Sequence, residues 1–155
     1  MRIIVVSDSH GDCFDLYRAI DAEKHADYVF FLGDGCDEIL DASTIYSSRK
    51  QFCMVKGNCD LGSKLPANAL VSVAGKKIYV THGYLEDVKN GISGLRRHAE
   101  ETGADIVLFG HTHLQTLEEE NGVYYFNPGS IRACRYGVID ITESGTVCEH
   151  KRLMG

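Results

Sequence analysis

Residues 2–11 read RIIVVSDSHG, in which a continuous apolar run is followed at once by Asp8 and His10. Apolar runs without alternation are typical of strands that are covered on both faces of a sheet. The same arrangement, an apolar run and then a short glycine-marked polar segment, recurs at residues 28–32, 52–55, 76–80 and 106–109. In an open α/β sheet, ligands collect beyond the carboxyl ends of the strands, so we expect these polar segments to lie together.

Seven side chains of metal-ligand type lie in these segments: Asp8, His10, Asp34, Asn58, His82, His111 and His113. Taken singly, each has an ordinary explanation as a turn residue or as a hydrogen-bonded histidine at a strand end. Taken together, they are about the number of ligands that two divalent ions need when one carboxylate bridges them. The other histidines, His25, His98 and His150, lie elsewhere, and we expect them to be solvent-exposed or packed in the usual way.

The paired motifs D-x-H and H-x-H would each bring two ligands together if the backbone stays extended. Alternate residues of an extended chain point to the same face, so Asp8 and His10 should reach the same ion. For the same reason His111 and His113 should place two imidazoles close together, an arrangement that suits divalent transition metals.

The 155 residues are expected to form a single domain, residues 1–155, of the α/β class. The apolar spacing predicts helices at 12–24, 37–47 and 92–101, a hairpin at 70–80, and further strands at 115–117, 123–126, 137–141 and 147–151. This order predicts two mixed β-sheets packed as a sandwich and flanked by helices, four layers in all. The acidic run 118–120 is expected to be a solvated hairpin turn.

The composition limits the classes of function. A net charge of −6 argues against a general nucleic-acid binder, but it allows a small phosphorylated substrate because bound metal ions reverse the local charge. The first apolar run is too short for a signal peptide or a membrane span, and the six cysteines form no C-x-x-C pair. We therefore expect a cytoplasmic protein with reduced cysteines and no membrane association, and we leave a homo-oligomer open.

The ordered motifs D-x-H, G-D, G-N, H and G-H-x-H, over residues 8–113, resemble those of the calcineurin-like metallophosphoesterase superfamily. The G-N-C-D at 57–60 and the N-P-G-S at 127–130 resemble its compact, YfcE-like phosphodiesterase branch. The resemblance implies one ion held by Asp8, His10, Asp34 and His113, and a second held by Asp34, Asn58, His82 and His111, with Asp34 bridging. Mixed O and N ligands favour Mn²⁺, with Fe, Zn²⁺, Ni²⁺ or Co²⁺ as alternatives.

The chemistry implied is hydrolysis of a small phosphodiester. Two ions about 3.5–4 Å apart share and acidify a water, and the bridging hydroxide attacks phosphorus in line. Many superfamily members carry a histidine after the motif asparagine to protonate the leaving oxygen, but here Cys59 follows Asn58, so Cys59 or Asp60 is the candidate replacement. Asp37 is expected to orient neighbouring groups or to cap the second helix. The candidates for substrate selectivity are Cys36, Lys64, Tyr84 and Arg132.

A binding scaffold is the competing class of function, because the retromer subunit Vps29 uses the same fold as an interaction platform. A scaffold can lose metal ligands, whereas this chain keeps all seven. On this reasoning, fewer than one ion per chain would favour the scaffold.

Overall fold

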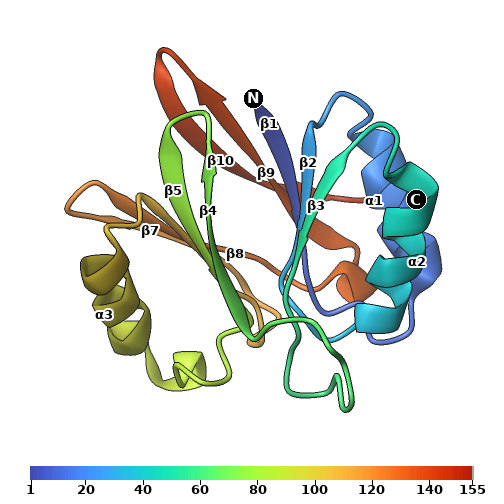
Figure 1. Cartoon of the computed structure of the whole chain (residues 1–155), viewed down its shortest axis with the longest axis horizontal. Coiled ribbons are helices and arrows are strands. Elements are labelled where there is room, and N and C mark those ends of the chain that lie inside the picture. Colours follow the sequence, from blue (N-terminus) through green and yellow to red (C-terminus); the bar gives the residue numbers. More distant parts are fainter. Residues whose placement is uncertain (155) are drawn as a thin grey trace.

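The computed structural model describes residues 1–154, which contain ten strands, three α-helices and two short 3₁₀ helices (Figure 1). In chain order they are β1 (Arg2–Val6), α1 (Cys13–Ala22), β2 (Tyr28–Phe31), α2 (Cys36–Tyr46), β3 (Gln51–Met54), β4 (Asn68–Val73), β5 (Lys76–Thr81), η1 (Val88–Asn90), α3 (Ser93–Thr102), β6 (Ile106–Leu108), β7 (Gln115–Glu120), β8 (Val123–Pro128), η2 (Ile131–Ala133), β9 (Arg135–Thr142) and β10 (Gly145–Arg152).

The strands form two five-stranded mixed sheets. The first has the order β10-β9-β1-β2-β3, in which β1, β2 and β3 are parallel and β9 runs antiparallel to β1. The second has the order β4-β5-β6-β8-β7, in which β5, β6 and β8 are parallel and the outer strands are antiparallel to their neighbours. The predicted hairpin of β4 and β5 is therefore confirmed.

The apolar run of β1 is buried on both faces, as its lack of alternation predicted. Ile4 and Val6 pack with the helices α1 and α2 on the outer face of the first sheet, and Ile3 and Val5 point into the core between the sheets. Leu95 of α3 packs on the outer face of the second sheet (Figure 1). The four-layer α/β/β/α arrangement predicted from the sequence is thus confirmed.

The acidic run is the main error in the predicted elements. Glu118, Glu119 and Glu120 are not a turn but the second half of β7, and they pair with residues 123–125 of β8. β7 is an edge strand, where charged side chains can reach solvent and discourage pairing with other chains. The turn itself is Asn121-Gly122, and Glu120 forms an ion pair with Arg96 of α3 at 2.6 Å.

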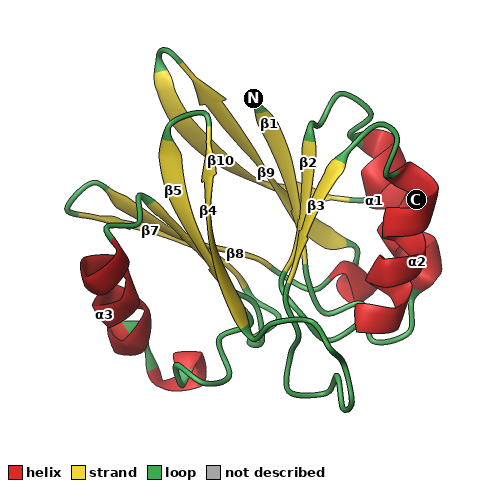
Figure 2. Cartoon of the chain, in the orientation of Figure 1, coloured by secondary structure: helices red, strands yellow, loops and turns green. Residues whose placement is uncertain are grey.

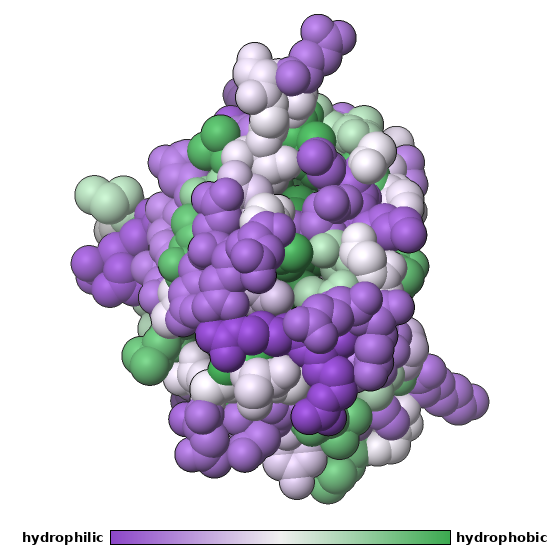
Figure 3. Space-filling view, turned by 90° about the vertical axis from the view of Figure 1, so that its left-hand side faces the viewer, coloured by the Kyte–Doolittle hydropathy of each residue, from purple (hydrophilic) through white to green (hydrophobic). Residues whose placement is uncertain are grey.

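The loops that follow the parallel strands of both sheets gather at one end of the molecule, where these strands have their carboxyl ends (Figure 2). The side face over α3 is mostly hydrophilic (Figure 3). Within residues 1–154 no helix is long and apolar enough to span a membrane. All six cysteines are free.

Candidate metal centre

The loops that carry the candidate ligands have an unusual backbone. Five of the seven candidates adopt the left-handed conformation, with φ of 59° at Asp8, 44° at His10, 61° at Asp34, 70° at His111 and 63° at His113. This conformation costs a non-glycine residue about 1–2 kcal/mol, so it persists where neighbouring contacts enforce it, often at functional sites. The condition of an extended backbone at D-x-H and H-x-H is therefore not met, and each motif is a tight coil instead.

Asp8, His10 and His113 form the first cluster. The Nε2 atom of His113 lies 3.2 Å from Oδ1 of Asp8, and Nε2 of His10 lies 3.5 Å from the same oxygen. The two Nε2 atoms lie 3.3 Å apart, and at this separation they cannot both carry a hydrogen. A cation shared by both nitrogens and the carboxylate removes that conflict.

The carboxylate of Asp8 tests whether this cluster fits a metal. Oδ2 accepts hydrogen bonds from the Ser7 hydroxyl at 2.6 Å and from the backbone N–H of His111 at 3.3 Å. Oδ1 is buried, and it accepts no hydrogen bond from any residue that the structure describes. Leaving such an atom unpaired costs about 1–3 kcal/mol or more, and a bound cation supplies the missing partner. The donor set therefore fits a divalent ion.

Asp34, His82 and His111 form the second cluster. Nε2 of His82 lies 3.2 Å from Oδ2 of Asp34 and 3.2 Å from Nδ1 of His111. Nδ1 of His82 donates a hydrogen bond to the carbonyl of Leu32 at 2.7 Å, because a carbonyl can only accept. In its neutral form, the one that binds a metal ion, His82 therefore presents the lone pair of Nε2 to the cluster, an orientation common among metal-binding histidines.

Asp34 lies between the two clusters. Its Oδ2 faces Nε2 of His82 at 3.2 Å and Nε2 of His10 at 3.8 Å, and its Oδ1 accepts the backbone N–H of Cys59 at 2.8 Å. Burial alone would raise the pKa of Asp34, but the hydrogen bond and charge of His82, together with the Cys59 N–H, lower this pKa to about 2. Asp34 is therefore ionised at neutral pH and faces a histidine of each cluster.

Asn58 and Cys59 follow on the next loop, and both are exposed. Asn58 lines a cavity together with His82. The sulfur of Cys59 lies within 4.8 Å of one potential ligand atom each of His10 and Asp34. Burial and then the negative charge of Asp34 raise the pKa of the Cys59 thiol, which favours the protonated form.

Asp60 has an environment that the sequence did not suggest. Its carboxylate accepts four backbone N–H groups, those of Asp34 and Gly57 at 2.7 Å, Gly35 at 2.9 Å and Cys36 at 3.0 Å. Burial raises the pKa of Asp60, but these N–H groups outweigh burial and lower it. An ionised carboxylate with both oxygens engaged is poorly suited to protonate a leaving group, so this geometry does not support that hypothesis for Asp60.

Asp60 also has the role that the sequence analysis gave to Asp37, that of capping the N-terminus of α2. α2 begins after Gly35 without a side-chain cap of its own, and Asp37 lies exposed in its first turn. The expectation that Asp37 caps the helix is therefore wrong, because the first N–H groups of α2 point at the carboxylate of Asp60.

Three buried polar residues support the ligand loops, and the sequence analysis assigned none of them a role: Ser7, Asn127 and Ser130. Asn127 donates hydrogen bonds to the carbonyl of Gly110 at 3.1 Å and to the Thr112 hydroxyl at 3.0 Å. The Ser130 hydroxyl donates to the carbonyl of Asp8 at 2.8 Å. The available signal was the polar N-P-G-S segment directly after the apolar residues of β8.

The remaining three histidines are exposed to solvent or packed against other side chains, as expected. His25 is exposed in the turn after α1. His98 stacks on Tyr79, with ring centroids 4.8 Å apart, and His150 stacks on Phe126 at the same distance. None of the three belongs to either cluster.

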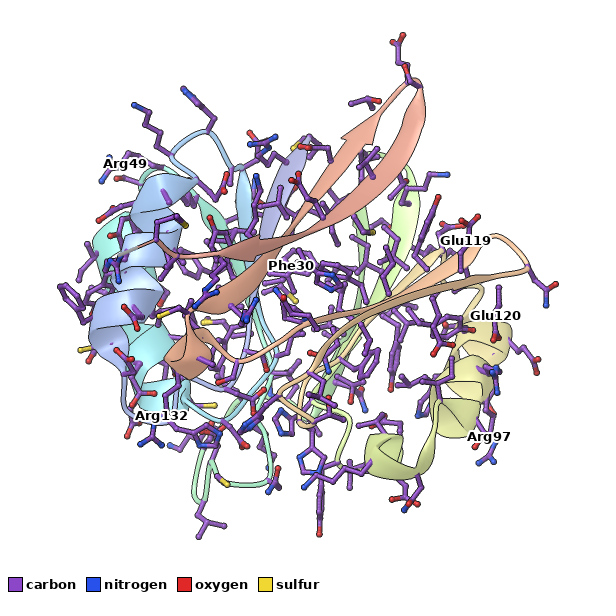
Figure 4. The ribbon with its side chains drawn as sticks, turned by 180° about the vertical axis from the view of Figure 1, so that it is seen from behind. Phe30, Arg49, Arg97, Glu119, Glu120 and Arg132 are labelled. Atoms are coloured by element: carbon purple, nitrogen blue, oxygen red, sulfur yellow. The ribbon has the colours of Figure 1, made fainter. Side chains whose placement is uncertain are left out.

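Three of the four selectivity candidates, Tyr84, Arg132 and Cys36, line a cavity or groove at the site. Tyr84 lines the cavity on the side of the second cluster, and Arg132 lines a groove on the side of the first, where Figure 4 labels it. Cys36 is buried, with Sγ 3.9 Å from the carbonyl of Val55, and burial raises its pKa to about 12. Lys64 is exposed on the loop before β4.

Residues 1–144 match the family model described as the calcineurin-like phosphoesterase superfamily domain. The chain belongs to this superfamily. The resemblance inferred from the ordered motifs is thus confirmed.

Relatives within the superfamily have different descriptions. The probable metallophosphoesterase YsnB of Bacillus subtilis is 35% identical over 136 residues, which cover 87% of this chain and 78% of YsnB. Vacuolar protein sorting-associated protein 29 (Vps29) of Schizosaccharomyces pombe is also 35% identical, over 139 residues, with 84% and 72% covered. The phosphodiesterase YfcE of Escherichia coli K12 is 25% identical over 168 residues, with 90% and 88% covered.

A solved structure supports the same assignment. The crystal structure of a predicted phosphoesterase from Streptococcus pneumoniae superposes with a TM-score of 0.82 and 31% sequence identity. The match covers 97% of this chain and 88% of the other. The predicted metallophosphoesterase-type fold is therefore confirmed.

Gly57 offers a test of how closely the loops of this phosphoesterase-superfamily centre approach each other. A Cβ atom at this position would overlap Oδ1 of Asp34 and lie 2.7 Å from the Asp34 nitrogen. We expect Gly57→Ala to displace the Asp34 carboxylate and to weaken Mn²⁺ binding about 10–100-fold, the usual effect of disturbing groups behind metal ligands. Isothermal titration calorimetry with Mn²⁺ measures the change.

Gly122→Ala is the matched control for this variant. Gly122 has a φ of 80° in the turn between β7 and β8, and nothing lies within 4 Å of an added Cβ. The control should therefore lose some stability because of its backbone conformation, yet bind Mn²⁺ normally. Native affinity in Gly57→Ala would contradict the close packing inferred between Gly57 and Asp34.

Proposed function

We propose that this protein is a metal-dependent phosphodiesterase with a dinuclear metal centre. One ion would be held by Asp8, His10 and His113, the other by Asn58, His82 and His111, and Asp34 would bridge them. The observation that carries the proposal is the carboxylate of Asp34, ionised and buried between two facing histidine clusters. The superfamily membership and the relative YfcE support the class of reaction.

The donor set favours Mn²⁺, with Fe, Zn²⁺, Ni²⁺ or Co²⁺ as alternatives, since it combines imidazoles with carboxylate and amide oxygens. When bound, the ions would acidify a water for in-line attack on phosphorus and neutralise charge on the phosphoryl oxygens. The chain's own contribution is to fix the ligands: Ser7 orients Asp8, Leu32 orients His82, and the backbone of Cys59 orients Asp34.

Asn58, Cys59 and Asp60 take three different parts in the proposed reaction. Asn58 completes the second ion's ligands and lies against the substrate cavity. Cys59, whose sulfur lies within 4.8 Å of ligand atoms of His10 and Asp34, is the remaining candidate to protonate the leaving oxygen, but a thiol is a weaker acid than an imidazolium. Asp60 is a positioning residue that ties the loops of Asp34 and Gly57 together.

A weak acid beside the leaving group makes the rate depend on how well that group carries negative charge. We therefore expect bis(4-nitrophenyl) phosphate to be hydrolysed much faster than alkyl diesters. The proposed phosphodiesterase class also predicts faster hydrolysis than that of the monoester 4-nitrophenyl phosphate, which has the same leaving group. Removing metal with a chelator should reduce the rate to background, and Mn²⁺ should restore it. Nitrophenol and phosphate release, measured separately, test this; diester hydrolysis that survives full metal removal would refute the proposal.

The second candidate is a binding scaffold, and the 35% identity to Vps29 of S. pombe favours it. Metal content does not separate the candidates as the sequence argument assumed, because Vps29 of Entamoeba histolytica has been solved in complex with Zn²⁺. That protein matches the fold alone, at 19% identity and a TM-score of 0.76 over 98% of this chain and 99% of its own. Turnover is therefore the discriminating measurement.

The proposed partner is a small phosphodiester, without general nucleic-acid binding or membrane association. The net charge of −6 supports the first exclusion. The six free cysteines support the cytoplasmic location that we propose. A homo-oligomer is compatible with this function, and size-exclusion chromatography with light scattering measures it.

A further inference from the structure

We infer that the cavity beside Asn58 and His82 binds one ester arm of the substrate, an arm with a flat apolar body and a negative charge at its far end. This inference rests on the proposed function for the position of the phosphoryl group. It adds the chemical class of the group attached to phosphorus, which neither the superfamily nor the metal ligands specify.

The position and the wall of the cavity support this assignment. It has a volume of about 170 Å³, its wall is mainly carbon, and it opens directly beside the second cluster. Ligand pockets in proteins combine such an apolar wall with a few polar groups that fix orientation. The lining residues are Lys56, Gly57, Asn58, Ala67, Thr81, His82, Gly83, Tyr84 and Leu85.

Two large apolar side chains at this cavity are exposed, 56% for Tyr84 and 69% for Leu85. The Tyr84 ring meets the ring of His111 edge-on, with centroids 5.6 Å apart and planes at 75°, so it stands next to a candidate ligand. Aromatic rings prefer this edge contact or an offset stack. A T-shaped contact occupies at most one face of the Tyr84 ring, so Tyr84 can offer a face to a flat group bound in the cavity.

The loop that carries Tyr84 and Leu85 is held in place from behind. The carboxylate of Glu86 is buried, accepts the Thr81 hydroxyl at 3.0 and 3.1 Å, and lies 3.2 Å from Nε2 of His98. A pocket wall that is fixed before the ligand arrives loses little conformational entropy on binding. The cavity is therefore preformed.

Lys56 supplies the charge preference. It is the only lysine or arginine among the lining residues, and within residues 1–154 its ammonium has no carboxylate within 4.0 Å. The bound ions would already neutralise the phosphoryl group, so this ammonium is available for a second anion on the arm. The groove on the other side of the centre, beside His10 and Asp34, includes Arg132 as well as Asp37 and Glu38, but its wall is mainly polar and does not suit an apolar arm.

The test is calorimetric binding of three phosphate monoesters to the Mn²⁺-loaded protein: methyl phosphate, phenyl phosphate and 4-carboxyphenyl phosphate. Phenyl phosphate should bind about tenfold more tightly than methyl phosphate through contact with Tyr84. The carboxylate should add about threefold, typical of an exposed ion pair. None of these affinities depends on how easily a leaving group departs.

Variants separate the two contributions. Tyr84→Ala should remove the phenyl preference and Tyr84→Phe should keep it, whereas Lys56→Gln should remove only the gain from the carboxylate. Phe14→Ala is the matched control, because Phe14 is an aromatic residue with 70% exposure that does not line the cavity. Its affinities should all be unchanged.

Equal affinity for methyl and phenyl phosphate, a phenyl preference that survives Tyr84→Ala, or no binding of any probe would each overturn the assignment of an apolar arm. A carboxylate gain that survives Lys56→Gln would overturn the charge preference. Hydrolysis of bis(4-nitrophenyl) phosphate by the unmodified protein is measured in parallel. If the protein hydrolyses the diester but shows no preference for phenyl phosphate, only the assignment of the cavity to an apolar arm is rejected. If it shows a Tyr84-dependent phenyl preference but no hydrolysis, only the proposed phosphodiesterase function is rejected.

Discussion

Asp34→Asn should lower the turnover of bis(4-nitrophenyl) phosphate at least about 100–1,000-fold, the scale of losing a central electrostatic contact in an active site. It should also leave the protein with at most one ion per chain. The amide oxygen of the substituted side chain can still accept the Cys59 N–H, and the amide NH₂ group then occupies the position of Oδ2. Its hydrogens would point where Oδ2 now faces His82 and His10, so both ions lose a negative ligand.

The free energy of unfolding of this variant, with and without metal, should show whether Asp34 is a metal ligand or a carboxylate with a purely structural role. Without metal, the substitution should cost some stability, because the lowered pKa of Asp34 reports a favourable contact with His82 that the amide loses, although the amide keeps the Cys59 hydrogen bond. With metal, the unmodified protein should gain about 2.7 kcal/mol at a free-ion concentration of 100 Kd, and the variant should lose most of that gain. Thermal unfolding with and without Mn²⁺, together with elemental analysis, measures both effects.

Two further substitutions of the same kind serve as references. Asp37→Asn changes an exposed aspartate in the first turn of α2 and should alter neither activity nor ion content. Asp60→Asn turns an NH₂ group toward backbone N–H groups, so it should destabilise the protein even without metal. An Asp34→Asn variant that still binds two ions with native affinity would rule out Asp34 as the bridge.

The layers of this fold could be predicted because burial leaves a direct mark on the sequence. Residues 3–6 have no alternation since both faces of β1 are covered, and the run at 28–31 in β2 has the same cause. The edge strand β7 could not be recognised in the same way. Glu118 and Glu119 point to opposite faces of this edge strand and are both exposed, so they resemble a loop although they are paired with β8.

The ligands could be predicted as residue types, but their geometry could not. D-x-H is compatible with an extended chain, and the left-handed backbone of Asp8 and His10 arises from long-range hydrogen bonds. The N–H of Asp8 donates to the carbonyl of Gly33 at 2.9 Å, and that of His10 donates to the carbonyl of Asp34 at 3.0 Å. Such contacts depend on where β2 ends relative to β1, which local sequence does not reveal.

His111→Ala and His113→Ala should each lower turnover about 100-fold or more, but they should weaken different ions. His113 faces Asp8 and His10 of the first cluster, whereas Nδ1 of His111 faces His82 of the second. The two histidines are separated by one residue, yet their coiled backbone directs them apart. Mn²⁺ titration should therefore show one tight and one weakened site in each variant.

Double variants identify which ion each histidine holds. Substitutions that remove ligands of the same ion should be non-additive, and those that affect different ions should be closer to additive. His113→Ala combined with His10→Ala should therefore cost little more than either alone, while His113→Ala combined with His82→Ala should weaken both sites. His25→Ala provides the control for an exposed histidine outside both clusters and should bind two ions normally. If His111→Ala and His113→Ala weakened the same site, the division into two clusters that share Asp34 would be wrong, and with it the dinuclear centre.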